Sequence, residues 1–248
     1  LYYRIFDVLI FMFWVVRNLI LTRPKNIYVS TDPPLLVPFV VFLYSKISGS
    51  SYIYHLQDIH PEVGNTVIKL NPMLFTFFKK IDNLVIRNAS SIITINETMK
   101  NEIIARSKTK SKIHLVDNPA VSVAGIVQGK IKGFVFSGNA GRLQRIPLLL
   151  KSINKYKDEG GVLPFLFIGA GVYSDEIRTL SNKYKDIEYK GLVDTNTAND
   201  LTSRYEWALL PIEDEVTKYA FPSKTSSYAS CGSNILSICS EQTSVAKW

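Results

Sequence analysis

The sequence predicts an α/β fold of two doubly wound domains with parallel sheets. Short apolar runs typical of strands alternate with longer helical patterns along most of the 248 residues. This repeated strand-helix-strand order is typical of the doubly wound class. The strand-like runs are continuously apolar rather than alternating, which favours parallel sheets covered by helices on both faces.

The opening stretch, residues 1–21, is strongly apolar and is expected to be a helix. Arg4, Asp7 and Arg17 interrupt it, so its uncharged run is about half the ~20 residues that a membrane span needs. It also lacks the basic start and cleavage site of a signal peptide. We favour a buried helix of the domain core, and a helix lying in the bilayer surface is the alternative.

The alternation then continues in chain order. In the first half, strands are expected at residues 26–31, 52–55, 91–95 and 112–116, and helices at 35–48, 73–88 and 97–107. In the second half, strands are expected at 133–137, 163–168, 187–189, 207–210 and 235–238, and helices at 146–157, 174–184, 198–203 and 222–230. Residues 119–132 carry no clear period, so we place a domain junction there, with domains at 1–120 and 121–248. We expect the carboxyl ends of both sheets to face each other across a cleft that holds the active site.

Charge and cysteine usage narrow the function classes. The formal charge of +8 is concentrated in residues 1–124, which hold 14 basic and 8 acidic residues. This fits an anionic membrane surface or a phosphate-bearing ligand, or simply a solvated basic face. No nucleic-acid-binding module accompanies the basic residues.

Cys231 and Cys239 show no pairing pattern and are expected to be reduced core residues of a cytoplasmic protein. The histidines lack the spacing of a zinc site.

In the second domain, three loops follow predicted strands and precede helices, where a phosphate would bind. "SGNAGRLQRIP" starts at Ser137, "GAGVYSDE" at Gly169 and "YAFPSK" at Tyr219. Gly138 and Gly141 would let a diphosphate approach the backbone, and either Arg142 or Arg145 could neutralise it. Each glycine also fits a tight turn, and the spacing from Gly169 to Gly171 is not a dinucleotide fingerprint.

Lys224 is the strongest of these signals. It follows Pro222 and Ser223 at the start of a predicted short helix, where the helix dipole repels cations. A surface lysine is therefore unattractive at this position, and an anion placed between the amine and the helix would resolve the conflict.

In the first domain, "HLQDIHPEVG" ends a predicted strand and crowds ionisable groups together. Polar groups at the carboxyl end of a strand in this fold class are often site residues, so Asp58 is a candidate, although it could simply cap a turn. His60 and Glu62 are weaker candidates, and His55 also fits a satisfied core histidine.

Several of these stretches resemble one family when taken together. "HLQDIHPE", "FSGNAGRLQ", "FIGAG", "YKGLVD", "ALLPI" and "FPSKTSSYASCGSNIL" occur in the order seen in family 4 glycosyltransferases, which have the GT-B fold. The chain is most similar to the O-antigen and capsule branch that contains the fucosamine transferases. The resemblance covers nearly the whole chain, and its Pro-Ser-Lys element is the most specific part.

The resemblance implies a retaining, metal-independent transferase without a cofactor, which uses a nucleotide-diphospho-sugar as co-substrate. It places Gly138, Asn139 and Gly141 near the diphosphate, with Lys224 paired to it. Asp58, with His55 or Glu62, would face the reacting sugar from the first domain. A lipid-linked glycan acceptor and a position at the cytoplasmic face of the membrane are the expectations that follow.

The chain also departs from the family pattern. The usual Glu pair corresponds to Tyr219 and Ser227, and the usual Arg and Lys of the glycine loop correspond to Asn139 and Gln144. The family's first strand-helix-strand unit and last helix are absent, so we expect a truncated chain. Two alternatives remain: a non-catalytic subunit that docks to a membrane assembly, or a GT-B sugar-nucleotide 2-epimerase, for which the expected acidic and histidine residues are missing.

Overall fold

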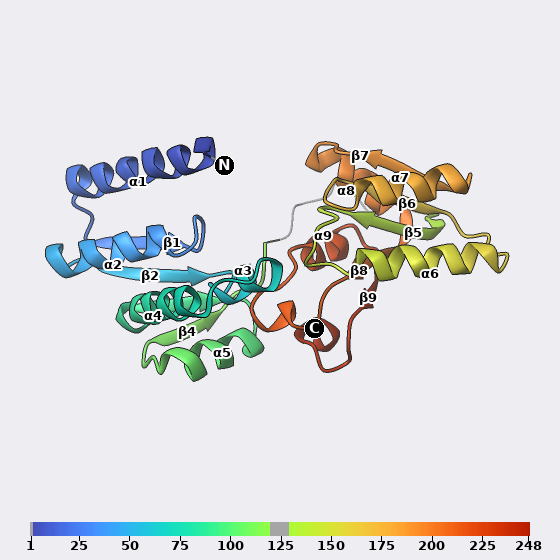
Figure 1. Ribbon diagram of the computed structural model, residues 1–248. Helices are drawn as coiled ribbons and strands as arrows, with labels where there is room; N and C mark the ends of the chain where they lie inside the picture. The colour runs from blue at the N-terminus through green and yellow to red at the C-terminus, as the bar shows by residue number, and fades with distance from the viewer. Residues whose placement is uncertain (1, 120–128) are drawn as a thin grey trace. The chain divides into compact units, whose positions relative to one another are not determined.

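The computed structural model describes residues 2–119 and 129–248, and the chain divides into two compact units (Figure 1). Unit 1 comprises Leu1–Asp117 and Lys218–Phe221, and unit 2 comprises Asn118–Thr217 and Pro222–Trp248. Most of the junction predicted at residues 119–132 falls on residues 120–128, which lie outside the described residues.

Unit 1 is built on a four-stranded parallel sheet in the order β1-β2-β3-β4. The strands are β1 Asn26–Ser30, β2 Ser51–Leu56, β3 Ser91–Thr94 and β4 Lys112–Leu115. The helices are α1 Tyr2–Thr22, α2 Leu36–Ser48, α3 Glu62–Val67, α4 Pro72–Asn88 and α5 Glu97–Ser107. Every predicted element of this half is present, with ends shifted by at most one residue, whereas α3 was not predicted.

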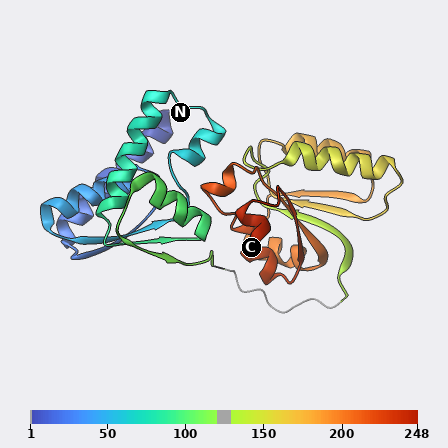
Figure 2. The same cartoon turned by 90° about the horizontal axis from the view of Figure 1, so that it is seen from below.

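Helices α2, α4 and α5 lie on the same face of this sheet (Figure 2). Tyr52 and Tyr54 of β2 point toward them and are buried, and the Tyr52 hydroxyl donates to the Val85 carbonyl at 2.5 Å. On the opposite face, Tyr28 and Ile53 are 60% and 36% exposed. The expectation of helices on both faces is therefore wrong for the described part of this sheet. Strand β2 alternates between buried and exposed residues, but aromatic residues occur at both kinds of position in this sheet, so the sequence looks continuously apolar.

Helix α1 carries apolar side chains over most of its circumference but packs along α2 by one stripe only. Leu19 is buried and Met12 and Val15 are half-buried, whereas Phe13 and Trp14 are 70% and 55% exposed. The expectation of a buried core helix is therefore wrong, because an apolar composition identifies a helix without showing which side a neighbour covers. None of the helices in residues 2–119 and 129–248 combines the length and apolarity that crossing a bilayer requires.

Unit 2 contains a five-stranded parallel sheet in the order β7-β6-β5-β8-β9. The strands are β5 Ile131–Ser137, β6 Phe165–Ile168, β7 Ile187–Gly191, β8 Tyr205–Pro211 and β9 Asn234–Ile238. The helices are α6 Ile146–Asp158, α7 Ser174–Lys183, α8 Thr195–Ser203, α9 Lys224–Ser230 and α10 Ser244–Lys247, and a 3-10 turn covers Val216–Lys218. The chain starts in the middle at β5, moves outward to β7, and then crosses to β8. The order of the strands therefore reverses between β5 and β8, the position where open parallel sheets bind ligands.

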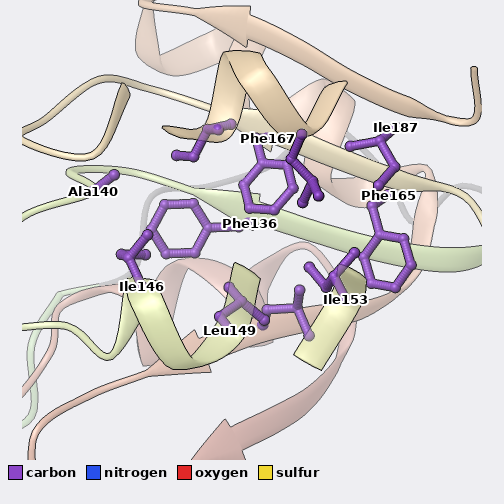
Figure 3. Close-up of a cluster of buried hydrophobic side chains, with 11 residues drawn as sticks. Phe136, Ala140, Ile146, Leu149, Ile153, Phe165, Phe167 and Ile187 are labelled. Carbon is purple, nitrogen blue, oxygen red and sulfur yellow. The ribbon is translucent and has the colours of Figure 1, made fainter. Parts of the chain in front are cut away.

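A cluster of buried apolar side chains fixes the central strands of unit 2 (Figure 3). Phe136 of β5 and Phe167 of β6 pack against Ile146, Leu149 and Ile153 of α6. The spacing of those three α6 residues is that of one helix face, which is why residues 146–158 form an amphipathic helix. Each fully buried Phe side chain contributes about 1.5–3 kcal/mol. The cluster thus holds the ends of β5 and β6 at fixed positions.

Candidate functional site

A hollow of about 500 Å³ lies at the carboxyl ends of β5 and β6 in unit 2, beside the point where the strand order reverses. Its walls are formed by the ends of these two strands, the residues after β7, and helices α8 and α9. Gly138, Asn139, Gly169, Ser223 and Lys224, all predicted from sequence, line it. Five predicted donor residues from three separate loops therefore meet at one place.

The Lys224 side chain is half-buried at this hollow and is held by neutral groups. Its Nζ donates to Gln144 Oε1 at 2.8 Å and lies 3.5 Å from the Asn139 carbonyl oxygen. The same nitrogen lies 4.1 Å from the centroid of the Phe136 ring, within the range of a cation–π contact. Among the described residues, no carboxylate lies within ion-pair distance of Lys224.

This environment changes the acidity of the amine. Burial lowers the pKa of Lys224 from 10.5 to about 7, because the charged ammonium loses water and gains no counter-ion. A bound anion would restore the charge and raise the pKa. With a pKa of about 7, the amine is only partly protonated at neutral pH, and an anion beside it would favour the charged form.

Two glycines let the strand ends come close to the amine. Gly138 has φ +128°, and a Cβ there would collide with Cε of Lys224. Gly169 has φ +109°, and a Cβ there would collide with the carbonyl of Gly138. L-residues rarely adopt these backbone angles, so both positions require glycine for conformation as well as for space.

Tyr228 of α9 joins the helix to the end of β5. Its buried hydroxyl accepts from the Ser137 backbone N–H at 2.9 Å and donates to the Ser137 carbonyl at 3.0 Å. Helix α9 begins at Lys224, two residues later than predicted, and the hydroxyl of Ser223 at its N-cap makes no capping hydrogen bond. Ser223 is instead exposed at the wall of the hollow.

Three of the predicted donor residues lie away from the wall. Gly141 is buried behind Asn139 and does not line the hollow, and Arg142 is exposed outside it. Arg145 pairs with Glu213 at 3.3 Å and with Asp214 at 2.8 Å, so it is already neutralised. Of the two arginines proposed to neutralise a diphosphate, neither lines the hollow.

In unit 1, Asp58 follows β2 and is half-buried. It forms an isolated antiparallel bridge with Ala220, and the next residue, Ile59, donates its N–H to the Tyr219 carbonyl at 2.7 Å. Burial raises the pKa of Asp58; neighbouring His60 opposes this shift and Asp32 adds to it. A carboxyl group with a raised pKa is a candidate acid or base.

The remaining two catalytic candidates of unit 1 have structural partners. His55 Nδ1 lies 2.5 Å from the Tyr28 hydroxyl on the open face of the sheet, and burial lowers its pKa. Glu62, the first residue of α3, is buried and pairs with Arg106 at 2.5 Å and with Lys79 at 3.0 Å. Arg106 also pairs with buried Asp82 and donates to the His60 carbonyl at 2.9 Å. This geometry favours a structural role for Glu62, and the catalytic assignments remain predictions.

The two cysteines are both unpaired, but they differ in burial. Cys231 is buried, so its prediction as a core residue is confirmed, whereas Cys239 is only half-buried and its prediction is wrong. In the described ranges, no three His, Cys, Asp or Glu residues are grouped as a metal site would need.

Gln144 is a partner of Lys224 that sequence reasoning missed. The residue stands in the quoted "GRLQ" stretch, two residues before the start of α6. Its place in a glycine loop was the available signal, but nothing in the local spacing indicates that the loop reaches Lys224.

These features define an α/β protein of two parallel-sheet units, with a hollow beside Lys224 in the second. Comparisons with solved structures agree with that class. The chain is similar to Anabaena Alr3699/HepE in complex with UDP, with 15% identity and a TM-score of 0.62 over 91% of this chain and 62% of that one. It is also similar to the lipopolysaccharide outer core galactosyltransferase WaaB in its apo form, with 16% identity and a TM-score of 0.62 over 94% and 61%. The predicted GT-B fold class is confirmed.

Among curated proteins, the chain is 23% identical over 223 residues to the "Probable glycosyltransferase WbjE" of Pseudomonas aeruginosa. The match covers 82% of this chain and 54% of that protein, so the chain spans about half the length of this relative. No protein-family model matches the chain.

Proposed function

We propose that the chain is part of a glycosyltransferase that binds a nucleotide-diphospho-sugar at the hollow of unit 2. The observation that carries the proposal is the Lys224 ammonium, half-buried at a hollow of about 500 Å³ with no carboxylate partner in the described part of the chain. An unpaired buried cation is unfavourable on its own, and a diphosphate would compensate it.

The shape of the hollow supports a nucleotide donor. Gly138 and Gly169 leave open backbone beside the amine, which suits a diphosphate, and the wall continues to residues of α8 such as Thr195 and Asn199. A volume of a few hundred Å³ is typical of small-molecule and cofactor sites. The Alr3699/HepE structure, similar in fold, was solved with UDP.

The proposed reaction breaks the bond between the anomeric carbon and the diphosphate oxygen. A new bond forms from that carbon to an acceptor hydroxyl oxygen, and the hydroxyl proton ends on the departing nucleoside diphosphate. Negative charge grows on the diphosphate as it leaves, and Lys224 would stabilise it without a metal. We assign the retaining, metal-independent chemistry of family 4 to this chain as part of the proposal, with Asp58 facing the reacting sugar.

We further propose a lipid-linked glycan acceptor for cell-surface polysaccharides such as O-antigen or capsule, used at the cytoplasmic face of a membrane. Two features of unit 1 support it: Phe13 and Trp14 of α1 are exposed, and Met73 and Phe77 lie with Lys80 on an exposed face of α4. Aromatic side chains beside cations suit an anionic bilayer surface.

Vesicle binding tests the membrane proposal. Co-sedimentation with phosphatidylglycerol vesicles should fall several-fold in Phe13→Glu, because the change places a charge on the exposed apolar surface of α1. It should stay unchanged in Val162→Glu, a matched control at an exposed site in unit 2. Equal sedimentation of both variants would contradict the membrane proposal.

Donor binding is tested by titrating UDP and GDP calorimetrically. We expect the unmutated chain to bind one of them, Lys224→Ala to lose at least about tenfold in affinity, and UMP to bind more weakly than UDP. Lys132→Ala is the matched control, since Lys132 is an exposed residue of β5 outside the hollow.

If neither nucleotide binds, the transferase proposal is wrong and a non-catalytic docking subunit becomes the better proposal. The exposed apolar surface of α1 is the observation that favours this second candidate. A 2-epimerase is disfavoured, because the residues that line the hollow include no Asp, Glu or His.

A further inference from the structure

We propose that Gln144 is a positioning residue that holds the Lys224 ammonium at the hollow without neutralising it, so that the ligand's diphosphate supplies its first negative charge. The inference deepens the proposed function and depends on it for the identity of the anion. Gln144 does not line the hollow and acts only through Lys224.

Gln144 contacts the amine of Lys224 directly. Gln144 Oε1 accepts from Lys224 Nζ at 2.8 Å, the shortest of the polar contacts that hold this nitrogen; the Asn139 carbonyl lies at 3.5 Å. Gln144 is itself placed by the turn before α6, where its N–H donates to the Gly141 carbonyl at 3.2 Å. The contact joins two segments that are 80 residues apart in the sequence.

Arg145, the residue after Gln144, forms ion pairs with the carboxylates of Glu213 and Asp214. The Leu143 carbonyl accepts from the Glu213 N–H at 3.1 Å. Asp214 also accepts hydrogen bonds from the backbone and hydroxyl of Ser240. The acidic groups bound to this loop are thus paired with Arg145 and Ser240, and the loop presents the Gln144 amide to Lys224.

The remaining groups that face the amine are also uncharged. β5 contributes the Phe136 ring and the loop after it contributes the Asn139 carbonyl, while Tyr228 of α9 lines the same hollow. Burial raises the pKa of the Tyr228 phenol, so it stays protonated at neutral pH. An amide oxygen can orient an ammonium by a hydrogen bond while leaving its net charge in place, whereas a carboxylate would cancel that charge.

The test compares Gln144→Glu with Gln144→Leu, and uses Gln242→Glu as the matched control because Gln242 is exposed in unit 2 and does not line the hollow. The first readout is the dissociation constant for UDP. We expect Gln144→Glu to weaken UDP binding by at least about tenfold, since a new ion pair competes with the diphosphate, and Gln144→Leu by about three- to tenfold through lost orientation. Gln242→Glu should bind like the unmutated chain.

The second readout needs no nucleotide. In protein labelled with 13C-lysine, the pH titration of the Lys224 Cε resonance, assigned by its loss in Lys224→Ala, should move to higher pH in Gln144→Glu and stay in place in Gln242→Glu. A purely structural role for Gln144 would not raise this pKa.

The outcomes separate the two proposals. If the unmutated chain binds UDP, Lys224→Ala loses it and Gln144→Glu binds UDP as before, the role of Gln144 is overturned and the transferase proposal stands. If no nucleoside diphosphate binds but Gln144→Glu still raises the Lys224 pKa, the coupling of the two side chains is supported and the transferase proposal fails. An unchanged Lys224 pKa in Gln144→Glu overturns the role of Gln144 in either case.

Discussion

Arg106 in unit 1 and Lys224 in unit 2 are both cations withdrawn from solvent, but their surroundings are opposite. Arg106 is 2% exposed and pairs with two carboxylates, Glu62 and Asp82, that are 4% and 1% exposed. Lys224 meets an amide, a backbone carbonyl and an aromatic ring, and opens on a hollow.

The difference separates charge that holds a fold together from charge available to a ligand. The Arg106 network ties α3, α4 and α5 to one another, and its carboxylates are neutralised within unit 1. The Lys224 site leaves its positive charge unbalanced, which is unfavourable for the empty protein and favourable for binding an anion. Unsatisfied charge, and not the number of ionisable groups, therefore marks the candidate site in this molecule.

The largest effect is expected from removing the cation of unit 1. Arg106→Met removes the guanidinium that buried Glu62 and Asp82 share, and breaking such a network typically costs about 3–5 kcal/mol. Lys79 still pairs with Glu62 and the Tyr54 hydroxyl still donates to Asp82, so we expect a loss at the low end of this range. Urea unfolding should show this loss, whereas Lys100→Met, which removes a half-buried cation paired with exposed Glu97, should change stability by less than about 1 kcal/mol. Similar small values for both variants would contradict the contrast between the two cations.

A smaller effect is expected from filling the space beside the cation of unit 2. Gly138→Ala adds a methyl group that collides with the Lys224 side chain at φ +128°, so we expect a stability loss of about 1–3 kcal/mol and about tenfold weaker UDP binding. Gly160→Ala is the control, since Gly160 has φ +88° but open space around its Cβ position. It should lose about 1 kcal/mol and leave UDP binding unchanged. Equal UDP affinity in both variants would show that the glycine turn does not confine Lys224.

The mildest test is pH alone. The pKa of Lys224 is about 7 in the empty protein, and a bound diphosphate raises it, so binding takes up a proton above neutral pH. Affinity for UDP should be highest between about pH 6 and 7, where the amine and the diphosphate are both largely charged, and should fall toward tenfold per unit above pH 7 until the pKa of the bound state is reached. UDP itself is fully ionised above about pH 7, since its last phosphate pKa is about 6. Lys224→Met should show a flat profile from pH 7 to about 9, and a sloping profile in that variant would assign the effect to another group.

Local pattern predicted most of the fold, and failed where the pattern was short or ambiguous. Apolar spacing identified each long helix and each strand, but α3 and α10 have six and four residues, too few to show a helical period. The exposure of α1 was not predictable either, since a helix that is apolar over most of its circumference does not show which side a neighbour covers.

The candidate site was predictable where it depended on backbone geometry. Gly138, Gly169 and Lys224 could be identified because glycines and a helix start at the ends of parallel strands are typical of phosphate-binding loops. Glu62 could not be assigned, because its partners lie 17 and 44 residues away at Lys79 and Arg106 and no local spacing indicates them. The sequence showed Gln144 only as a substitution in the family's glycine loop. Its contact with Lys224 could not be predicted, because the two residues are 80 positions apart in the sequence.

The paired hydrogen bonds of Tyr228 to both backbone groups of Ser137 have a mechanical consequence. The Tyr228 phenol links the last residue of β5 to α9, so the turn at Gly138 and the start of α9 at Lys224 are held in fixed positions relative to each other. A ligand bound there would require little rearrangement, because the entropy of ordering these residues is already lost when the chain folds.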